Sequence, residues 1–134
     1  MEPISEHKEF IFNKSIDEES LRSLYEDDYL YIEEIFRLTL QDLEPEANNA
    51  LKHYQSKDFT ALRRTIHKIK PSFGFIGMPA LQEKCQEFEK ACDQEPKSQD
   101  FEKDFEILST TIAQSIEVIR SEIKKLEVFN RSAI

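Results

Sequence analysis

The chain has 134 residues, of which 39% are hydrophobic and 34% charged, and it contains only two glycines and no tryptophan. This length is sufficient for one hydrophobic core without support from metals or disulfides. The composition is typical of a soluble, strongly helical domain, and it excludes a disordered chain and a fibrous one.

Neither a membrane span nor a secretory leader is predicted. No run approaches ~18 consecutive apolar residues, and the first ten residues, MEPISEHKEF, lack the basic-then-apolar order of a signal peptide. We therefore expect a cytoplasmic protein. Cys85 and Cys92 stand roughly 10 Å apart along one predicted helix, which is too far for a disulfide. Both are expected to be core thiols, and no metal site is predicted.

The net charge of −9 is unevenly distributed along the chain. Residues 1–50 carry fourteen acidic side chains against four basic ones, whereas residues 51–78 carry one acidic side chain against six basic ones. An acidic protein with one local cationic face is poorly suited to general nucleic-acid binding and well suited to docking an acidic pocket of a partner protein. A charge run is also the ordinary solvated face of a helix, so charge alone does not decide between these two interpretations.

The N-terminal part is predicted to be an arm followed by a short helix. Residues 1–14 show no clear periodicity and are expected to form an arm, with apolar residues 10–12 available to pack on the body. Ser15 and Glu18 have the spacing of a capping box, in which each side chain accepts a hydrogen bond from a free backbone N–H at a helix start. A first helix is therefore expected from about 16 to 25.

A long helix is predicted from about Asp28 to Gln55, with Pro45 in its middle. The proline removes one backbone hydrogen bond and should bend the helix, and two shorter helices are the alternative. After a brief turn, Asp58 is the expected N-cap of a third helix, which runs to about Ile76. The apolar positions of the long helix recur at spacings of three and four. They are Ile32, Ile35, Phe36, Thr39, Leu43, Ala47, Ala50, Leu51 and Tyr54.

Two further helices follow. Gly77 can adopt the left-handed conformation that ends a helix, and Pro79 suits the first turn of a fourth helix, which is expected to end near Asp93. Residues 94–97 are expected to form a loop, and Ser98 to cap a last helix that runs to about residue 129. The side chains predicted to be buried in the fourth helix are Leu81, Cys85, Phe88 and Cys92. Those of the last helix are Phe101, Phe105, Leu108, Ile112, Ser115, Ile119, Ile123 and Leu126.

Four substantial amphipathic helices joined by short loops predict an all-α fold. We expect an antiparallel four-helix bundle with an additional short N-terminal helix, in a domain that spans residues 15–130.

The third helix carries the candidate functional residue, His67. Ile66, Ile69, Phe73 and Ile76 form one apolar stripe, and His67 lies one position, about 100° of rotation, away from it. The imidazole should therefore be reachable from solvent. The residues that share its face are cations or have little bulk. They are Arg63, Arg64, Lys70, Pro71 and Gly74.

His67 also begins a motif that continues into the fourth helix. The motif consists of His67-Lys68-Ile69-Lys70, then Ser72, Ile76-Gly77 and Leu81, with Cys85 and the pair Phe88-Glu89 beyond. It resembles the signature of histidine-containing phosphotransfer (HPt) domains. The motif spans about a fifth of the chain, and the helix layout extends the likeness to nearly all of it. One position departs, because the family usually has glycine where this chain has Pro71.

The resemblance implies that His67 is a phosphoacceptor. It implies that Nε2 of the ring exchanges a phosphoryl group with receiver-domain aspartates of a hybrid histidine kinase and a response regulator. Mg²⁺ is then expected on the partner receiver, with no cofactor on this chain. Two glycines leave no room for a glycine-rich nucleotide loop, so the chain is expected to be a phosphocarrier without ATP-dependent kinase activity of its own. A monomer is also expected.

The residue types around His67 suit this chemistry. A neutral imidazole is a good nucleophile near pH 7, and phosphoryl transfer requires cations near the phosphoryl oxygens. Lys70 can approach those oxygens, while Arg63, Arg64 and Lys68 can steer or hold an acidic partner.

Pro71 and Gly74 provide a partner-docking face of low bulk. Pro71 cannot donate a hydrogen bond to the carbonyl of His67, and it is expected to kink the helix beside the acceptor. The kink either turns the ring outward or marks a chain that has lost phosphoryl transfer.

Two other classes of function compete with this hypothesis. The first is a catalytically silent bundle that binds receiver domains as an interaction module through the face around His67. The second is a metal- or haem-binding bundle, which would need inward-facing ligands where aliphatic and aromatic residues are predicted. His7 and His53 are expected to be ordinary surface residues. A starting Met and a complete bundle favour a free-standing carrier over the excised end of a larger kinase.

Overall fold

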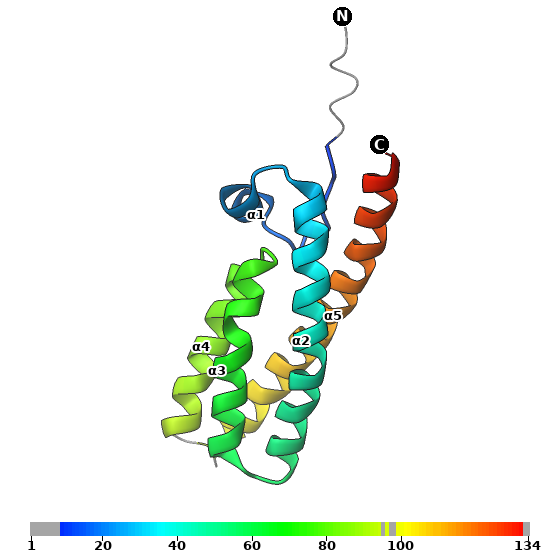
Figure 1. Ribbon diagram of the computed structural model, residues 1–134. Coiled ribbons are helices and arrows are strands. Elements are labelled where there is room, and N and C mark those ends of the chain that lie inside the picture. Colours follow the sequence, from blue (N-terminus) through cyan, green and yellow to red (C-terminus); the bar gives the residue numbers. More distant parts are fainter. Residues whose placement is uncertain (1–8, 95, 97–98, 133–134) are drawn as a thin grey trace, which may run out of the picture.

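The computed structural model describes residues 9–94, 96 and 99–132, and these residues form five α-helices and no strand (Figure 1). The helices are α1 (Glu18–Tyr25), α2 (Tyr29–Gln55), α3 (Phe59–Phe75), α4 (Pro79–Gln94) and α5 (Gln99–Ser132). The predicted all-α fold is confirmed, because α2 to α5 form an antiparallel bundle and α1 is the additional short helix (Figure 1). No helix in these described ranges is long and apolar enough to cross a membrane.

The four long helices pack around one core. α3 lies between α2 and α4, and α5 closes the bundle by packing mainly against α2 (Figure 1). Phe36 of α2 and Phe73 of α3 are fully buried between them. The buried positions predicted for α4 and α5 are all confirmed, including both cysteines, which are free thiols. One core position predicted for α2 is wrong, because Leu51 is 44% exposed.

The helix ends follow from the capping chemistry of single residues. Asp28 and Asp58 cap α2 and α3, and α2 continues through Pro45 as one helix, so the alternative of two shorter helices is wrong. Gly77 has a φ of 75°, which is the left-handed conformation predicted for it. Pro79 is the first residue of α4, as predicted. The predictions for Ser98 and for residues 1–8 lie outside the described residues.

The start of α1 differs from the prediction. Asp17, and not Ser15, is the N-cap, and the helix begins at Glu18. Ser15 instead donates its hydroxyl to the side chain of Asn13 (2.8 Å), and Glu18 accepts the backbone N–H of Phe12 (3.1 Å). The predicted capping box is therefore wrong, because an aspartate directly before the first turn supplies the stronger acceptor.

The arm before α1 is packed between the first turn of α2 and the last turns of α5. Phe10 and Phe12 are buried, and the ring of Phe10 lies 5.5 Å from that of Phe129. The backbone N–H of Asn13 donates to Oε1 of Glu122, a carboxylate with a side chain only 1% exposed (2.8 Å). The N-terminal arm and the last turns of α5 are thus packed together, although they lie at opposite ends of the described chain.

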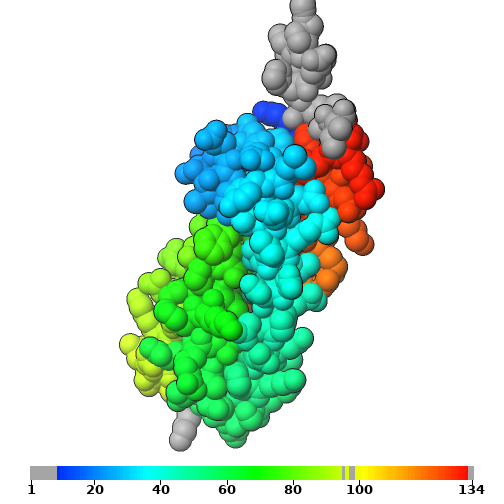
Figure 2. All heavy atoms as spheres, viewed as in Figure 1, coloured from blue at the N-terminus to red at the C-terminus, as the bar shows by residue number. Residues whose placement is uncertain are grey.

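α1 rests on the end of α3 and fixes the turn between α3 and α4 (Figure 2). The backbone N–H of Asp17 donates to the carbonyl of Gly77 (2.7 Å). The hydroxyl of Tyr25 donates to the carbonyl of Phe75 (2.8 Å). These two hydrogen bonds tie α1 to the turn between α3 and α4. They therefore hold α3 and α4 in a fixed register.

Candidate functional site

The imidazole of His67 lies at the surface of α3. Its side chain is 68% exposed, whereas its neighbours Ile66 and Ile69 are almost fully buried. The apolar stripe of α3 therefore anchors the helix in the core and leaves the histidine outside it. The predicted exposure of the ring agrees with the structure.

Glu89 of α4 holds one nitrogen of this ring. Its Oε1 lies 2.7 Å from Nδ1 of His67. An ionised carboxylate can only accept a hydrogen bond, so Nδ1 must carry the proton in this contact. In the neutral ring Nε2 is then the nitrogen with a free lone pair, and a lone pair of this kind can act as a nucleophile.

Lys70 of α3 holds the second oxygen of the same carboxylate. Its Nζ lies 2.7 Å from Oε2 of Glu89, and both side chains are mostly buried, at 19% and 12% exposure. Oε2 is buried and accepts no hydrogen bond of suitable angle within the described part of the chain. The contact is therefore an ion pair that is not a directed hydrogen bond, and it ties Lys70 to Glu89.

The pKa of Glu89 reflects these contacts. Partial burial alone would raise it, but the close contacts with Lys70 and His67 and their positive charge outweigh burial and lower the pKa below its usual value. Glu89 is consequently a carboxylate at neutral pH. It can keep the proton on Nδ1 and can stabilise positive charge on the ring.

The remaining cations of α3 differ in whether they form ion pairs with neighbouring helices. Arg63 pairs with Asp93 of α4 at 3.0 Å, and Lys68 pairs with Glu46 of α2. The pKa of Lys68 is raised by its hydrogen bond to that carboxylate and by the carboxylate charge. Arg64 is exposed and has no ion pair among the described residues. The structure therefore neutralises most of the cationic face in contacts with α2 and α4.

Pro71 and Gly74 occupy different environments on α3. Pro71 is exposed within a helix that continues to Phe75, and it leaves the carbonyl of His67 without its usual helical donor. Gly74 is half-buried beneath Gln82 of α4, since a Cβ atom there would lie 2.8 Å from Oε1 of that side chain. Of the two residues, only Pro71 is exposed.

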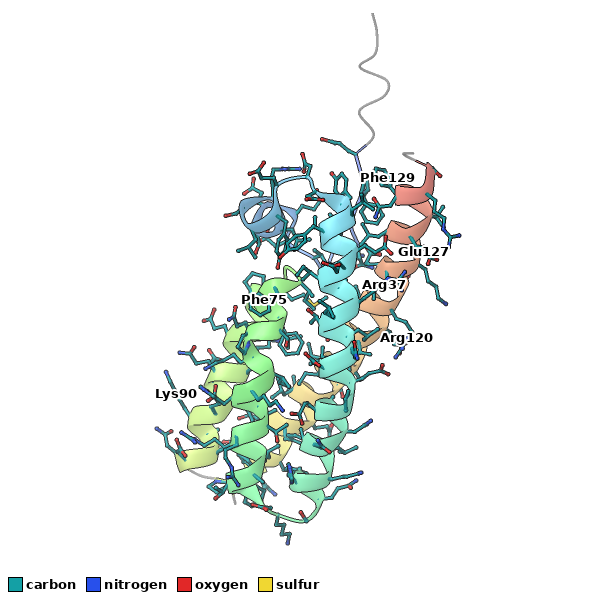
Figure 3. The ribbon with its side chains drawn as sticks, viewed as in Figure 1. Arg37, Phe75, Lys90, Arg120, Glu127 and Phe129 are labelled. Carbon is teal, nitrogen blue, oxygen red and sulfur yellow. The ribbon has the colours of Figure 1, made fainter. Side chains whose placement is uncertain are left out.

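An exposed apolar patch, which we call the α1–α3 patch, lies beyond the C-terminal end of α3. It consists of Leu24 of α1, Tyr31 of α2 and Phe75 of α3, which are 54%, 46% and 51% exposed. The ring of Tyr25 contacts Tyr31 (5.6 Å), and its hydroxyl bonds to Phe75, so the three helices meet here. Figure 3 shows Phe75 at this corner of the molecule. Sequence analysis missed the patch, because its residues come from three helices.

Sequence analysis also missed the role of Glu89. Its only signal was its place in the Phe88-Glu89 pair of the motif. Nothing in the spacing of twenty-two residues between His67 and Glu89 places the two side chains together, because that depends on how α3 and α4 pack. The described residues contain no cluster of side chains that could hold a metal ion.

Comparison with known proteins gave one family. The family model described as Hpt domain matches residues 33–126, which is well over half of the chain. This range contains α3 and α4 entirely, with His67, Lys70 and Glu89. No curated protein and no solved structure matched significantly.

Proposed function

Since the chain belongs to the Hpt domain family, we propose that His67 is the phosphoacceptor of a phosphorelay. Hpt domains serve histidine phosphotransfer generally and are phosphocarriers, not kinases. In this chain Nε2 of His67 accepts a phosphoryl group from the aspartate of one receiver domain, in a hybrid histidine kinase, and donates it to that of another, in a response regulator. The observation that supports this assignment is the exposed ring held at Nδ1 by Glu89 at 2.7 Å.

The transfer step uses the lone pair of Nε2. It attacks phosphorus in the acyl phosphate of the receiver, an N–P bond forms, and the P–O bond to the aspartate breaks. The aspartate leaves as a carboxylate and keeps the bonding electrons. Nδ1 keeps its proton, so the ring becomes positively charged, and the carboxylate of Glu89 stabilises this charge. In the reverse step the same atoms return the phosphoryl group.

The protein needs no metal of its own for this step. A loose, in-line phosphoryl transfer depends on positioning and on charge stabilisation at the equatorial oxygens. We place the required Mg²⁺ on the receiver. Arg64 is the cation nearest in sequence to His67 that is not committed to an ion pair within the described ranges, and it is best placed to meet the added negative charge.

The partner approaches over Pro71 and the α1–α3 patch. Pro71 is compact and leaves the ring accessible, and Phe75 lies about one further turn along α3. The patch exposes large apolar side chains of the kind that mark protein interfaces. We therefore assign receiver docking to this corner of the bundle.

The proposal is tested by incubating the protein with a phosphorylated receiver domain. We expect an acid-labile, alkali-stable adduct whose ³¹P NMR signal identifies phosphorylation at Nε2, and we expect His67→Gln to abolish it. His53→Gln is the matched control and should leave the adduct unchanged. Receiver binding without any adduct on the unsubstituted protein would instead support the silent interaction module.

A further inference from the structure

A second surface of the bundle, between α2 and α5, is hollowed along its length. One hollow of about 420 Å³ lies between the two helices, and its floor reaches Ile66 of α3. A second hollow of about 910 Å³ lies toward the C-terminal end of α2 and exposes the rings of Tyr54 and Phe59. Both are lined by Leu51, Phe105 and Ser109, so they form one continuous groove, which we call the α2–α5 groove.

The sequence pattern of α5 explains why the groove is open. Positions 102, 106, 109, 113 and 117 share one stripe of the helix, because they follow one another at spacings of three and four. Two of these five positions, Ser109 and Ala113, are small, and Ala47 lines the same hollow from α2. Leu51 of α2, which stands at the junction of the two hollows, keeps 44% of its surface exposed although it continues the apolar stripe of its helix.

The rim of the groove is acidic. Glu102 and Glu106 of α5 are exposed, and neither forms an ion pair within the described residues. Both lie close to the hydroxyl of Tyr54, whose pKa is raised by partial burial and then by these two carboxylates. At the opposite end Arg120 is already held by Glu44 at 2.6 Å. Across both hollows the described lining carries four glutamates, Glu44, Glu102, Glu106 and Glu117, against two cations, Lys57 and Arg120. The groove therefore combines an apolar floor with a net negative charge.

From this combination we infer that the α2–α5 groove binds a basic amphipathic helix of a partner protein. The groove extends about 16 Å along α2, from Glu44 to Gln55, and about 27 Å along α5, from Glu102 to Arg120. A helix of about 14 residues is ~21 Å long and fits these dimensions. Its apolar side chains enter the two hollows around Leu51, and its cations meet Glu102 and Glu106.

The occupant is neither a receiver at His67 nor a second copy of this chain. His67 is held by α4, on the other side of α3, and the α1–α3 patch lies at the opposite end of α2: Tyr31 and Leu51 are about 30 Å apart along the helix. A second copy would carry the same net charge of −9 and would be repelled. The groove can therefore be filled while a receiver occupies His67.

The test uses a fluorescein-labelled synthetic helix of about 14 residues, with Leu on one face and Lys on the other. We expect saturable binding by fluorescence anisotropy that weakens as salt is added. In ¹⁵N NMR, the amide shifts should map to the second half of α2 and the middle of α5. A peptide of the same composition in scrambled order should bind at least about tenfold more weakly, because it cannot present one apolar face.

Two exposed apolar residues provide matched variants. Leu51→Lys places a cation at the centre of the groove and should weaken binding by about tenfold or more. Ile107→Lys makes the same charge change at a position of similar exposure (52%) on another face of α5, and it should alter binding by less than about twofold. Circular dichroism on both variants verifies that the bundle is intact.

Three results would overturn the inference. The first is an absence of saturable binding, the second is equal weakening by the two substitutions, and the third is a set of amide shifts confined to the α1–α3 patch. Because none of these measurements involves phosphate, the outcome is independent of whether His67 is a phosphoacceptor.

Discussion

Oε1 of Glu89 lies 2.7 Å from Nδ1 of His67, so the α4 helix determines which ring nitrogen of an α3 residue is free to react. The second oxygen of the same carboxylate is held by Lys70. The imidazole, the carboxylate and the ammonium group thus form a chain of contacts across the α3–α4 pair. These contacts link the reactivity of the ring to the packing of two helices.

Glu89→Ala should lower the rate of phosphoryl transfer to His67 by roughly tenfold to a hundredfold. A hydrogen bond to a charged group contributes about 1.5–3 kcal/mol, and here it stabilises the positive ring formed in the transfer. Glu89→Gln should fall between the wild-type protein and Glu89→Ala, because its amide oxygen can still accept from Nδ1. The measurement is single-turnover transfer from a phosphorylated receiver. Glu87→Ala, an exposed glutamate of α4, is the control. Wild-type rates for Glu89→Ala would remove the proposed positioning role.

Lys70→Met should destabilise the fold by about 1–2 kcal/mol at pH 7, because it leaves a mostly buried carboxylate without its cation. The pKa of Glu89 is lowered in the folded state, so this stabilisation is fully present above its unfolded pKa of ~4.3 and is lost as the pH falls through the folded value. The difference in the free energy of unfolding should therefore shrink below pH ~4.3. Urea denaturation at pH 7 and pH 3 measures it, with Lys84→Met, an exposed residue of α4, as the control. A difference that stays constant with pH would contradict the assignment.

Gly77→Ala should lower the stability by about 1–3 kcal/mol and reduce the melting temperature. The φ of 75° is strained for alanine, and the added Cβ would lie 2.9 Å from Cγ of Leu21. Gly74→Ala is the matched comparison, because its Cβ meets only the mobile end of Gln82 and its φ is not positive. Thermal unfolding should rank Gly77→Ala well below Gly74→Ala. Equal melting temperatures would show that the turn is not constrained as described.

Phe75→Glu should raise the apparent KM for a receiver domain by about tenfold and leave the maximal rate of transfer nearly unchanged. The change adds charge to the α1–α3 patch without touching the ring of His67, so it weakens docking more than chemistry. Val128→Glu is the control, since Val128 is 62% exposed near the C-terminal end of α5 and is not part of the α1–α3 patch. A fall in the maximal rate with an unchanged KM would instead indicate a role for Phe75 in the transfer step.

The periodicity of the sequence was sufficient to predict the bundle. The helix periods placed the buried stripes of α3, α4 and α5, and single residues such as Asp58 and Gly77 marked helix ends through local chemistry. The start of α1 was mispredicted because Ser15 and Asp17 both satisfy local capping rules, and in the structure Asp17 caps the helix while the hydroxyl of Ser15 bonds to Asn13.

The charges of the site could be predicted only in part. The exposure of His67 follows from its helical period, but the acidic partners of Lys68 and Lys70 come from α2 and α4. The register between helices is determined by how side chains interlock in the core, and a pattern read along one helix does not contain it. The same reason explains why Leu51, a regular member of the apolar stripe of α2, lies open beside the small residues of α5.

The hydrogen bond between Asn13 and Glu122 joins residues that are 109 positions apart, so it also bears on how the protein is synthesised. While the ribosome is still translating α5, the segment around Phe10 can contact α2 but lacks the part of its packing surface that α5 supplies. Contacts of such long sequence separation form late and slow the folding of a chain. The layer that joins the arm to α2 and α5 can therefore assemble only after translation has passed α5, whereas the α3–α4 pair that carries His67 is already free to fold as a local hairpin.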